Sequence, residues 1–591
     1  MQTRKLAIAL AAGIWAMGLA VGPQAAGAAS GSGWPSQHVP HVYGEGVLFA
    51  FSGLDGKTSS TSPVVAGTVG DGIGLKFHLP QNPILRVFLP GGAAPRWQVV
   101  SNDLLVARIP RADLPMAIGF VSQSVLVGRL PPGGHVALEG GDTSVVLLRN
   151  EVGDRTHFAF AYDPNGAVAA AAAASAALRV SIKSLVEARL DFFAKAPKGP
   201  EGMRRGPATT LAKAFSVMKA NLYAPEPPIM VRWTTPCRWP HQYMGLWNSA
   251  FHSLGLMHLD LELAKEALEA VYLCQGQDGF IPQRMGPGQM DENSHPPILG
   301  WAAWQVYALG RMRDHEFLKR SFDVAQKHTT WYMKKRRLGG EPPSRKALEY
   351  GDPLYFWKSA AESGAENSPR FDGGSDFAAI DLSCYLVNEC RTLQTMAQRL
   401  GYRELAKTWG TRADRIAAAA RKFLWHPERR FFFDRKPDGE WLDTWTYAGL
   451  LPLWSGLADN AQAAHLKKHL LSEKFWATAG VATVARDDPK FKKDMWRGPV
   501  WININYLLIQ GLRRRGWTNE ADDLRTRTLE LIGTWYHKTG TFSEFYDPDN
   551  ETPPAELARK GGEVTTTPTP VIPDFNWTAA LYADLLLRPK P

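Results

Sequence analysis

Two glutamates in separate polar loops carry side chains that could do chemistry together. Glu366 lies within residues 357–376 and Glu544 within 539–549, two segments rich in acidic and aromatic residues. Functional side chains gather in such loops when a rigid scaffold carries them. Two carboxyl groups across a pocket can cleave a glycosidic bond, because one protonates the leaving oxygen and the other activates a water or attacks the anomeric carbon. Composition alone, however, favours surface acids that make turn or cap hydrogen bonds.

Seven short motifs strengthen the catalytic interpretation. In chain order they are WNSAFHSLG at 247–255, QDGFIP at 277–282, PP at 296–297, ESGAENSPR at 362–370, WRGPVW at 496–501 followed by Asn503 and Asn505, EFYDP at 544–548 and FNWT at 575–578. In content and order they resemble glycoside hydrolase family 63, the group of processing α-glucosidases and mannosylglycerate hydrolases, whose clan also includes the trehalases. The N-terminal part of the chain resembles that family only in general kind.

The resemblance implies an inverting, exo-acting hydrolase of α-linked glucose or mannose that uses no cofactor. The family's general acid falls on Glu366 and its general base on Glu544. An acid must hold its proton until it is used, so we expect apolar surroundings or a second carboxylate beside Glu366.

Five further residues fall near the substrate according to the resemblance. Trp247 and Trp496 would line the pocket, where apolar sugar faces stack on indole rings. Arg370 and Arg497 could donate to sugar hydroxyls or orient a carboxylate, although a structural ion pair explains either arginine equally well. Asn248 completes the expected substrate-binding set.

Two positions depart from the family pattern, which usually has aspartate where this chain has Glu366 and Asn248. Glu366 keeps the acid but reaches further. Asn248 replaces a charged acceptor with an amide that can also donate. We therefore expect an altered substrate. Two rival hypotheses remain, a carbohydrate-binding protein that has lost turnover and a trehalase-like hydrolase.

The elements that must position these residues fall into three parts. Between residues 34 and 165, short alternating runs such as Leu75, Phe77 and Leu79, separated by turn residues, predict an antiparallel β-sandwich. Residues 166–200 begin with an alanine tract and predict one long linker helix that ends near Lys195. From 201 to 591 the helical apolar period predicts an all-α (α/α)6 barrel.

The predicted barrel has about twelve helices, which suits six inner and six outer helices. They are expected near 205–222, 241–256, 259–274, 296–312, 314–334, 376–401, 403–424, 444–455, 459–471, 498–515, 518–538 and 575–588.

Residues 1–28 have the features of a secretory signal peptide. Arg4 and Lys5 precede an apolar stretch, and Ala26, Gly27 and Ala28 fit a small-residue cleavage site. We therefore expect a secreted or periplasmic protein with no membrane segment after cleavage.

Charge and composition limit the partners. The formal net charge is +10, and a hydrophobic fraction of 45% fits a globular protein. The densest basic runs, 334–337 and 513–515, come at the ends of predicted helices, where cations complement the helix dipole. This dispersed pattern argues against nucleic acid, so the expected partner is an oligosaccharide or glycoside substrate. The sequence does not specify the oligomeric state.

Neither a disulfide nor a metal site is specified by the residues. Cys384 and Cys390 lie on one predicted helix with their Cα atoms about 9 Å apart, too far to bridge. A bridge between Cys237 and Cys274 and four buried free thiols fit the sequence equally well. The acids around Asp547 lack the glycine and terminal glutamate of a calcium loop, so we expect a solvated turn and no metal.

Overall fold

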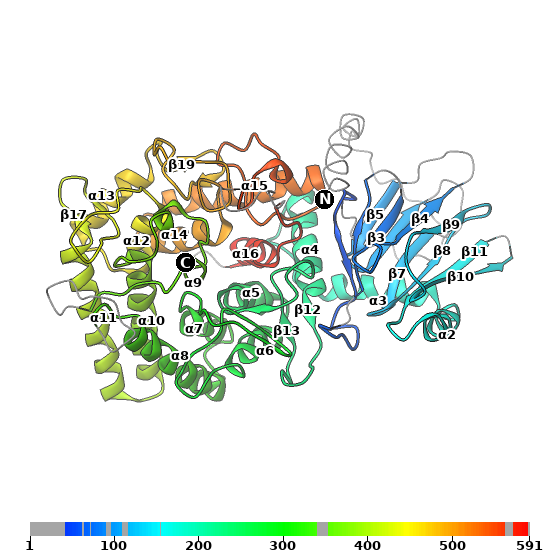
Figure 1. The fold of residues 1–591 in the computed structure, drawn as a ribbon, viewed down its shortest axis with the longest axis horizontal. Coiled ribbons are helices and arrows are strands. Elements are labelled where there is room, and N and C mark those ends of the chain that lie inside the picture. The colour runs from blue at the N-terminus through cyan, green and yellow to red at the C-terminus, as the bar shows by residue number, and fades with distance from the viewer. Residues whose placement is uncertain are drawn as a thin grey trace.

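The computed structural model describes residues 42–588 apart from 62–63, 71–72, 90–95, 109–115, 154, 340–352 and 562–570. The predicted signal peptide at 1–28 lies outside the described residues. Figure 1 shows two parts, with the strands (blue to cyan) at one end of the molecule and the helices (green to red) at the other. The antiparallel sheets and the helical C-terminal region predicted from the sequence are therefore both present.

The N-terminal part consists of two antiparallel sheets that share one apolar core. Their strand orders are β1-β2-β3-β4-β9 and β10-β11-β8-β7-β6-β5. Phe77 and Phe160, from different sheets, stack with ring centroids 4.2 Å apart. The strands are β1 Leu48–Ala50, β2 Val65–Thr68, β3 Ile73–Phe77, β4 Ile84–Phe88, β5 Arg96–Ser101, β6 Leu104–Arg108, β7 Met116–Ser122, β8 Val125–Arg129, β9 His135–Glu139, β10 Val145–Val152 and β11 Arg155–Tyr162.

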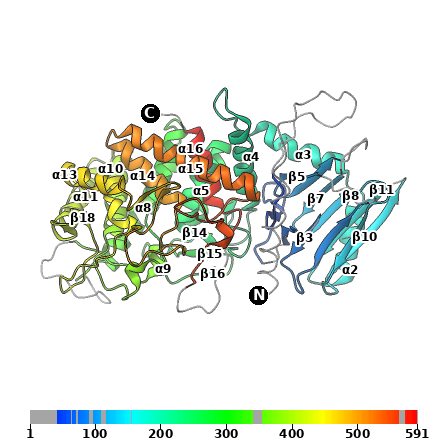
Figure 2. The same ribbon diagram turned by 90° about the horizontal axis from the view of Figure 1, so that it is seen from above.

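The single linker helix predicted from the sequence is wrong, because the segment forms two helices. These are α2 (Ala167–Ala177) and α3 (Ile182–Lys195), and they are bent by 81° relative to one another. The break has a local cause, since the Ser181 side chain accepts a hydrogen bond from the Ser184 amide at 3.2 Å and so caps a new helix. Both helices cover the outer face of the six-stranded sheet (Figure 2), where Ala170 and Leu185 are buried.

This bent pair meets the length and composition expected of a membrane span, whereas no single helix within the described ranges is long and apolar enough to cross a membrane.

Helices dominate the C-terminal part, and their order follows the predicted pattern closely. Six of them contact one another in a closed ring, in the order α5, α7, α10, α12, α14, α16 and back to α5. Apart from the short α9, the others pack outside this ring, each against an inner helix. The helices are α4 Arg205–Ala220, α5 Leu246–Leu259, α6 Leu261–Tyr272, α7 Leu299–Leu309, α8 His315–Lys335, α9 Ala360–Ser363, α10 Ile380–Arg399, α11 Arg403–Phe423, α12 Pro452–Ser455, α13 Asn460–Leu470, α14 Ile502–Arg514, α15 Thr518–Thr539 and α16 Asn576–Leu587.

Short strands and 3-10 turns shape the loops at the ends of these helices. They are β12 Leu222–Tyr223, β13 Trp233–Thr234, β14 Met244–Gly245, β15 Arg284–Gly286, β16 Gln289–Met290, β17 Trp425–His426, β18 Phe431–Phe432, β19 Trp476–Ala477, β20 Gly480–Val481, η2 Pro369–Phe371, η3 Tyr447–Leu450 and η4 Pro554–Glu556.

All four cysteines are buried free thiols, which decides between the two alternatives left open by the sequence. Burial raises the pKa of Cys237 to about 12 and that of Cys274 to about 11. These thiols therefore stay protonated and pack as small apolar side chains.

Candidate active site

The motif-bearing segments meet where the inner helices begin. Trp247 lies in the first turn of α5, the Glu366 loop leads into α10, and Trp496 precedes α14. The indole rings of Trp247 and Trp496 are 6.2 Å apart, and that of Trp577 at the start of α16 is 5.3 Å from Trp247. The N-terminal ends of four inner helices thus gather around one aromatic cluster.

A buried carboxylate fixes the chain just before Glu366. Glu362 is fully buried and forms a bidentate ion pair with Arg336, at 2.7 and 2.8 Å. The same carboxylate accepts hydrogen bonds from the amides of Lys358 and Ser294, at 2.8 and 3.3 Å. A carboxylate with this many donors is held in one position, so the loop enters the site along a fixed path.

Arg370 fixes the loop just after Glu366 and does not offer its guanidinium to a substrate. It is 3% exposed and donates four hydrogen bonds, two to Asp381 and two to Asp434, at 2.5–2.9 Å. The structural ion pair, which the sequence left as an alternative to substrate binding, is therefore the arrangement found here. Together with the ion pair of Glu362, the ion pairs of Arg370 fix both ends of the segment that carries Glu366.

Trp247 and Trp496 pack against the same loop. Gly364 has a φ of +75°, and a Cβ atom there would lie 2.5 Å from the Trp247 ring, so only glycine fits this turn. The Trp496 amide donates to the Asn367 side chain at 2.9 Å. Trp247 and Trp496 are 3% and 0% exposed, and both pack against the segment that carries Glu366.

Hydrogen bonds from both sides hold the segment that carries Glu544. Its amide donates to the Ile572 carbonyl at 3.0 Å, and the Phe542 amide donates to Asp574 at 3.1 Å. The Glu544 side chain is 4% exposed, and its carboxylate accepts from Arg559 Nε at 2.7 Å and Nη2 at 3.3 Å. The Arg559 guanidinium therefore fixes the position of this carboxylate through a buried ion pair.

Arg559 also links the two candidate carboxylates electrostatically. Burial lowers the pKa of Arg559, but the charges of Glu544 and Glu366 outweigh it and the pKa is raised overall. Glu366 is half-buried, and the Lys560 ammonium lies 3.8 Å from its carboxylate. The charged groups that the structure places near Glu366 are the cations Lys560 and Arg559, so the expectation of apolar surroundings or a neighbouring carboxylate stays a prediction.

Two aromatic side chains, His241 and Tyr243, adjoin these charged groups. The His241 ring lies 3.3 Å from Arg559 Nη2, and burial, together with the nearby cations, lowers its pKa to about 3. Burial raises the pKa of Tyr243, and the charge of Glu366 raises it further. Both rings are therefore neutral near pH 7 and can exchange hydrogen bonds with a ligand without changing charge.

Arg497 and Asn248, the other two polar residues expected near the substrate, differ in whether their side chains have partners. Arg497 forms a partly exposed ion pair with Asp372, at the far end of the Glu366 loop. Asn248 is 5% exposed in the first turn of α5, and its amide makes no hydrogen bond to the described residues. The Asn248 amide therefore has no partner among the described residues, while Arg497 has one.

Sequence reasoning missed Arg559, Lys560, His241 and Tyr243. No motif or spacing singles them out, because Arg559 and Lys560 come more than a dozen residues after Glu544 and His241 precedes the first motif. Their proximity depends on tertiary structure, and the pairing of a buried glutamate with a distant arginine has no local signature.

The acidic turn after Glu544 is held by its own hydrogen bonds. Asp547 accepts from the amides of Glu551 and Thr552, at 3.1 and 2.9 Å, and pairs with Lys493 at 2.9 Å. Across the part of the chain that the structure describes, no group of three or more His, Cys, Asp or Glu side chains is arranged to hold a metal ion.

Comparison with known proteins identifies the family. Residues 241–578 match the family described as the mannosylglycerate hydrolase MGH1-like glycoside hydrolase domain. A mannosylglycerate hydrolase of Rubrobacter radiotolerans is 30% identical over 443 residues, which cover 60% of this chain and 92% of that protein. A probable mannosyl-oligosaccharide glucosidase of Schizosaccharomyces pombe is 25% identical over 259 residues, covering 39% of this chain and only 32% of that protein.

A solved structure shares the fold. The crystal structure of the family 63 mannosylglycerate hydrolase from Thermus thermophilus in complex with Tris aligns with a TM-score of 0.52 and 22% identity, covering 64% of this chain and 99% of that one. The family match spans more than half of the chain and includes both Glu366 and Glu544. The chain therefore belongs to glycoside hydrolase family 63 and is a glycoside hydrolase of the mannosylglycerate hydrolase MGH1-like group.

Proposed function

We propose that this enzyme removes α-linked glucose or mannose from the end of a glycoside with inversion, using Glu366 as general acid and Glu544 as general base. The observation that carries the proposal is the pairing of Glu544 with Arg559 at 2.7 Å, together with the more exposed Glu366, whose charge also acts on Arg559. A general base must be held in position to accept a proton from water, and the buried Arg559 provides that support.

Glu366 supplies the proton in this proposal. Its loop is clamped at both ends by the ion pairs of Glu362 and Arg370, so the carboxyl group has a fixed position from which to reach a leaving oxygen. A bound sugar would exclude water from around Glu366 and leave its carboxyl group facing the leaving oxygen.

The helical part is well suited to an exo-acting enzyme. The closed ring of inner helices supports an (α/α)6 barrel, and the two candidate carboxylates lie on segments that precede inner helices. In the proposal the amide of Asn248 faces the sugar subsite, the buried Trp247 and Trp496 support the segment that carries Glu366, and Arg497 lies at the rim with Asp372. Arg370 acts only by positioning the loop.

The relatives suggest the first substrates to test. The Rubrobacter protein is named a mannosylglycerate hydrolase and the Schizosaccharomyces protein a glucosidase, so mannosylglycerate and α-glucosides are the two natural groups. Trehalose tests the trehalase-like alternative. Export to the periplasm or medium follows in the proposal from the leader at 1–28.

A glycoside panel tests the proposal. The purified enzyme should release free glucose or mannose from at least one α-linked substrate, and Glu544→Gln should abolish that release while leaving the thermal transition in place. Arg486→Gln, which removes an exposed arginine paired with Asp549, is the matched control and should keep full activity. Sugar binding without turnover in the native enzyme would mean that it only binds carbohydrate.

A further inference from the structure

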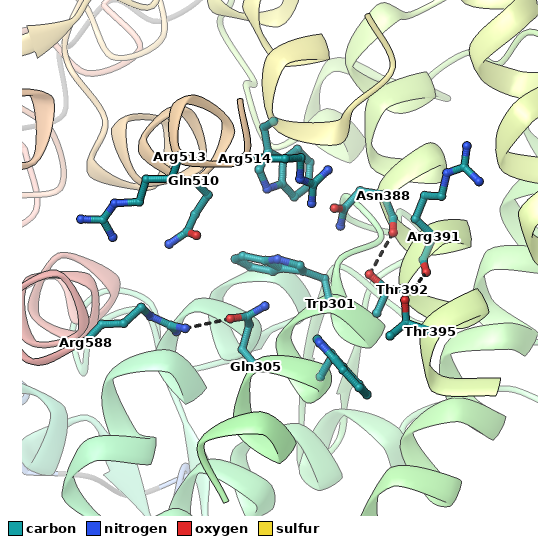
Figure 3. A pocket seen from close by; sticks show the side chains of 12 residues that line it. Trp301, Gln305, Asn388, Arg391, Thr392, Thr395, Gln510, Arg513, Arg514 and Arg588 are labelled. Atoms are coloured by element: carbon teal, nitrogen blue, oxygen red, sulfur yellow. Dashed lines mark hydrogen bonds between the residues drawn. The ribbon is translucent and has the colours of Figure 1, made fainter. Parts of the chain in front are cut away.

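A cavity lies away from the candidate carboxylates, toward the opposite ends of the inner helices. It has a volume of about 530 Å³, within the range of small-molecule sites. Its walls come from α7, α10, α12 and α14 and from the residue that follows α16 (Figure 3). The lining residues are Trp301, Trp304, Gln305, Asn388, Arg391, Thr392, Thr395, Trp454, Gln510, Arg513, Arg514 and Arg588.

This cavity is separate from the candidate active site. Glu366 and Glu544 lie at the N-terminal ends of the inner helices, whereas Gln510, Arg513 and Arg514 come from the last turns of α14. The Trp301 ring packs 6.2 Å from Phe251, which in turn packs 6.1 Å from Trp247. A layer of buried aromatic rings therefore stands between the two sites.

The lining of the cavity is cationic. It contains four arginines and no carboxylate. Figure 3 shows Arg588 reaching across toward Gln305, to which it donates at 2.9 Å, and Arg514 beside Asn388 on the opposite side. Arg588 also pairs with Asp584 at 3.0 Å, but Arg514 makes no ion pair or hydrogen bond to any described residue.

Burial and the neighbouring Arg515 lower the pKa of Arg514, so its charge is not compensated by the protein. The helix dipole explains why arginines end α14. It does not explain why the Arg514 guanidinium faces a cavity and has no partner among the described residues. An anion in the cavity would provide one.

Several lining side chains carry a donor atom that has no acceptor within the described part of the chain. Asn388 is 1% exposed, and its Nδ2 atom has no acceptor; the same holds for Trp454 Nε1, Arg513 Nε and Arg588 Nη2. Buried donors without acceptors are costly, so these walls are short of oxygen acceptors, although the four atoms themselves are closed to solvent. The partly buried face of Trp304 adds an apolar surface of the kind on which sugars stack.

We propose that this cavity binds a small organic oxyanion, a sugar or polyol that carries a phosphate or carboxylate group. Arg514 and Arg588 bind the anionic group, Gln305, Asn388 and Gln510 bond the hydroxyl groups, and the tryptophans contact the carbon skeleton. A guanidinium fork matches both kinds of oxyanion, so phosphate and carboxylate ligands share this chemistry.

Calorimetric titration of the full-length protein tests the proposal. The probes are glucose 6-phosphate for the phosphate, glucuronate for the carboxylate and glucose as the uncharged control, in the Glu544→Gln background so that catalysis does not interfere. We expect one charged probe or both to bind, and Arg514→Gln to weaken that binding about tenfold, the worth of a hydrogen bond to a charged group.

Arg515→Gln is the matched control. It removes the same charge one residue further along, but Arg515 does not line the cavity and instead bonds Asn460 at 3.0 Å. Binding that falls equally in both variants would reflect general attraction to a basic protein and would overturn the proposal, as would charged probes that bind no better than glucose. Arg514→Lys should recover part of the affinity, which separates a binding defect from misfolding.

Discussion

Lys213 and Asp574 form a fully buried ion pair, with Nζ 2.9 Å from Oδ2. The carboxylate also accepts from the Leu48 amide and the Asn102 side chain of the sandwich, at 3.0 and 2.9 Å. Its other oxygen accepts from the Phe542 amide, two residues before Glu544. One side chain thus joins the sandwich, helix α4 and the segment that carries the proposed base.

Asp574→Asn should therefore harm both stability and catalysis. It leaves the Lys213 cation buried without a counter-charge, which costs about 3–5 kcal/mol. Urea unfolding should show that loss, and kcat should fall because the Glu544 segment loses a hydrogen bond. The exposed Asp191–Lys195 pair provides the control, and Asp191→Asn should change the unfolding free energy by less than about 1 kcal/mol. Equal effects of the two substitutions would contradict this role for Asp574.

Arg559→Gln should lower kcat about tenfold to a hundredfold, less than the roughly 10²–10⁴ lost with a positioned base, because Glu544 remains but loses its orientation. KM should change little, since the interaction supports the reaction rather than substrate binding. Arg559→Lys should recover part of kcat by restoring the charge. Steady-state kinetics check this, and a variant that changes KM alone would instead place Arg559 in the substrate subsite.

Asn248→Asp should shift preference toward ordinary α-glucosides by about tenfold, the scale of one hydrogen bond to a charged group. The amide can donate as well as accept, whereas a carboxylate only accepts. Relative kcat/KM across a panel of glycosides is the measurement. Identical ratios in both proteins would show that Asn248 does not set specificity.

Buried histidines should make the protein less stable in acid. Burial lowers the pKa of His252 from 6.5 to about 3, so between these values the unfolded chain binds a proton that the folded chain does not. Stability is therefore lost as the pH falls through this window, by about 2 kcal/mol between pH 6.5 and 5 for this one residue. Unfolding free energies at several pH values should show a shallower slope for His252→Gln than for the exposed control His315→Gln. Parallel slopes would mean that His252 is not the cause.

Much of the helical architecture could be predicted because amphipathic helices leave a periodic apolar pattern. The helix expected at 376–401 is α10, Ile380–Arg399, and that expected at 518–538 is α15, Thr518–Thr539. The break between α2 and α3 was missed although its signal was present, since Ser181 is a good N-cap residue. The continuous run of good helix formers on either side of Ser181 favoured a single helix over this cap signal.

The surroundings of the candidate carboxylates could not be predicted in the same way. Arg336 and Glu362 are 26 residues apart, and Arg559 and Glu544 are 15 apart, with no periodic pattern to connect them. The role of Arg370 was open for the same reason, because a buried arginine and a substrate-binding arginine look alike until their partners are known. Motif resemblance found the two glutamates, but only the fold shows which charges surround them.

The stereochemistry of hydrolysis tests the central claim most directly. If Glu544 activates a water on the face opposite the oxygen that Glu366 protonates, an α-glycoside must yield the β-anomer first. Proton NMR of the first-formed sugar, recorded before mutarotation, gives the answer. The account predicts the β-anomer from the native enzyme and no release from Glu544→Gln, whereas an α-anomer formed first would mean retention and would contradict the roles assigned to Glu366 and Glu544.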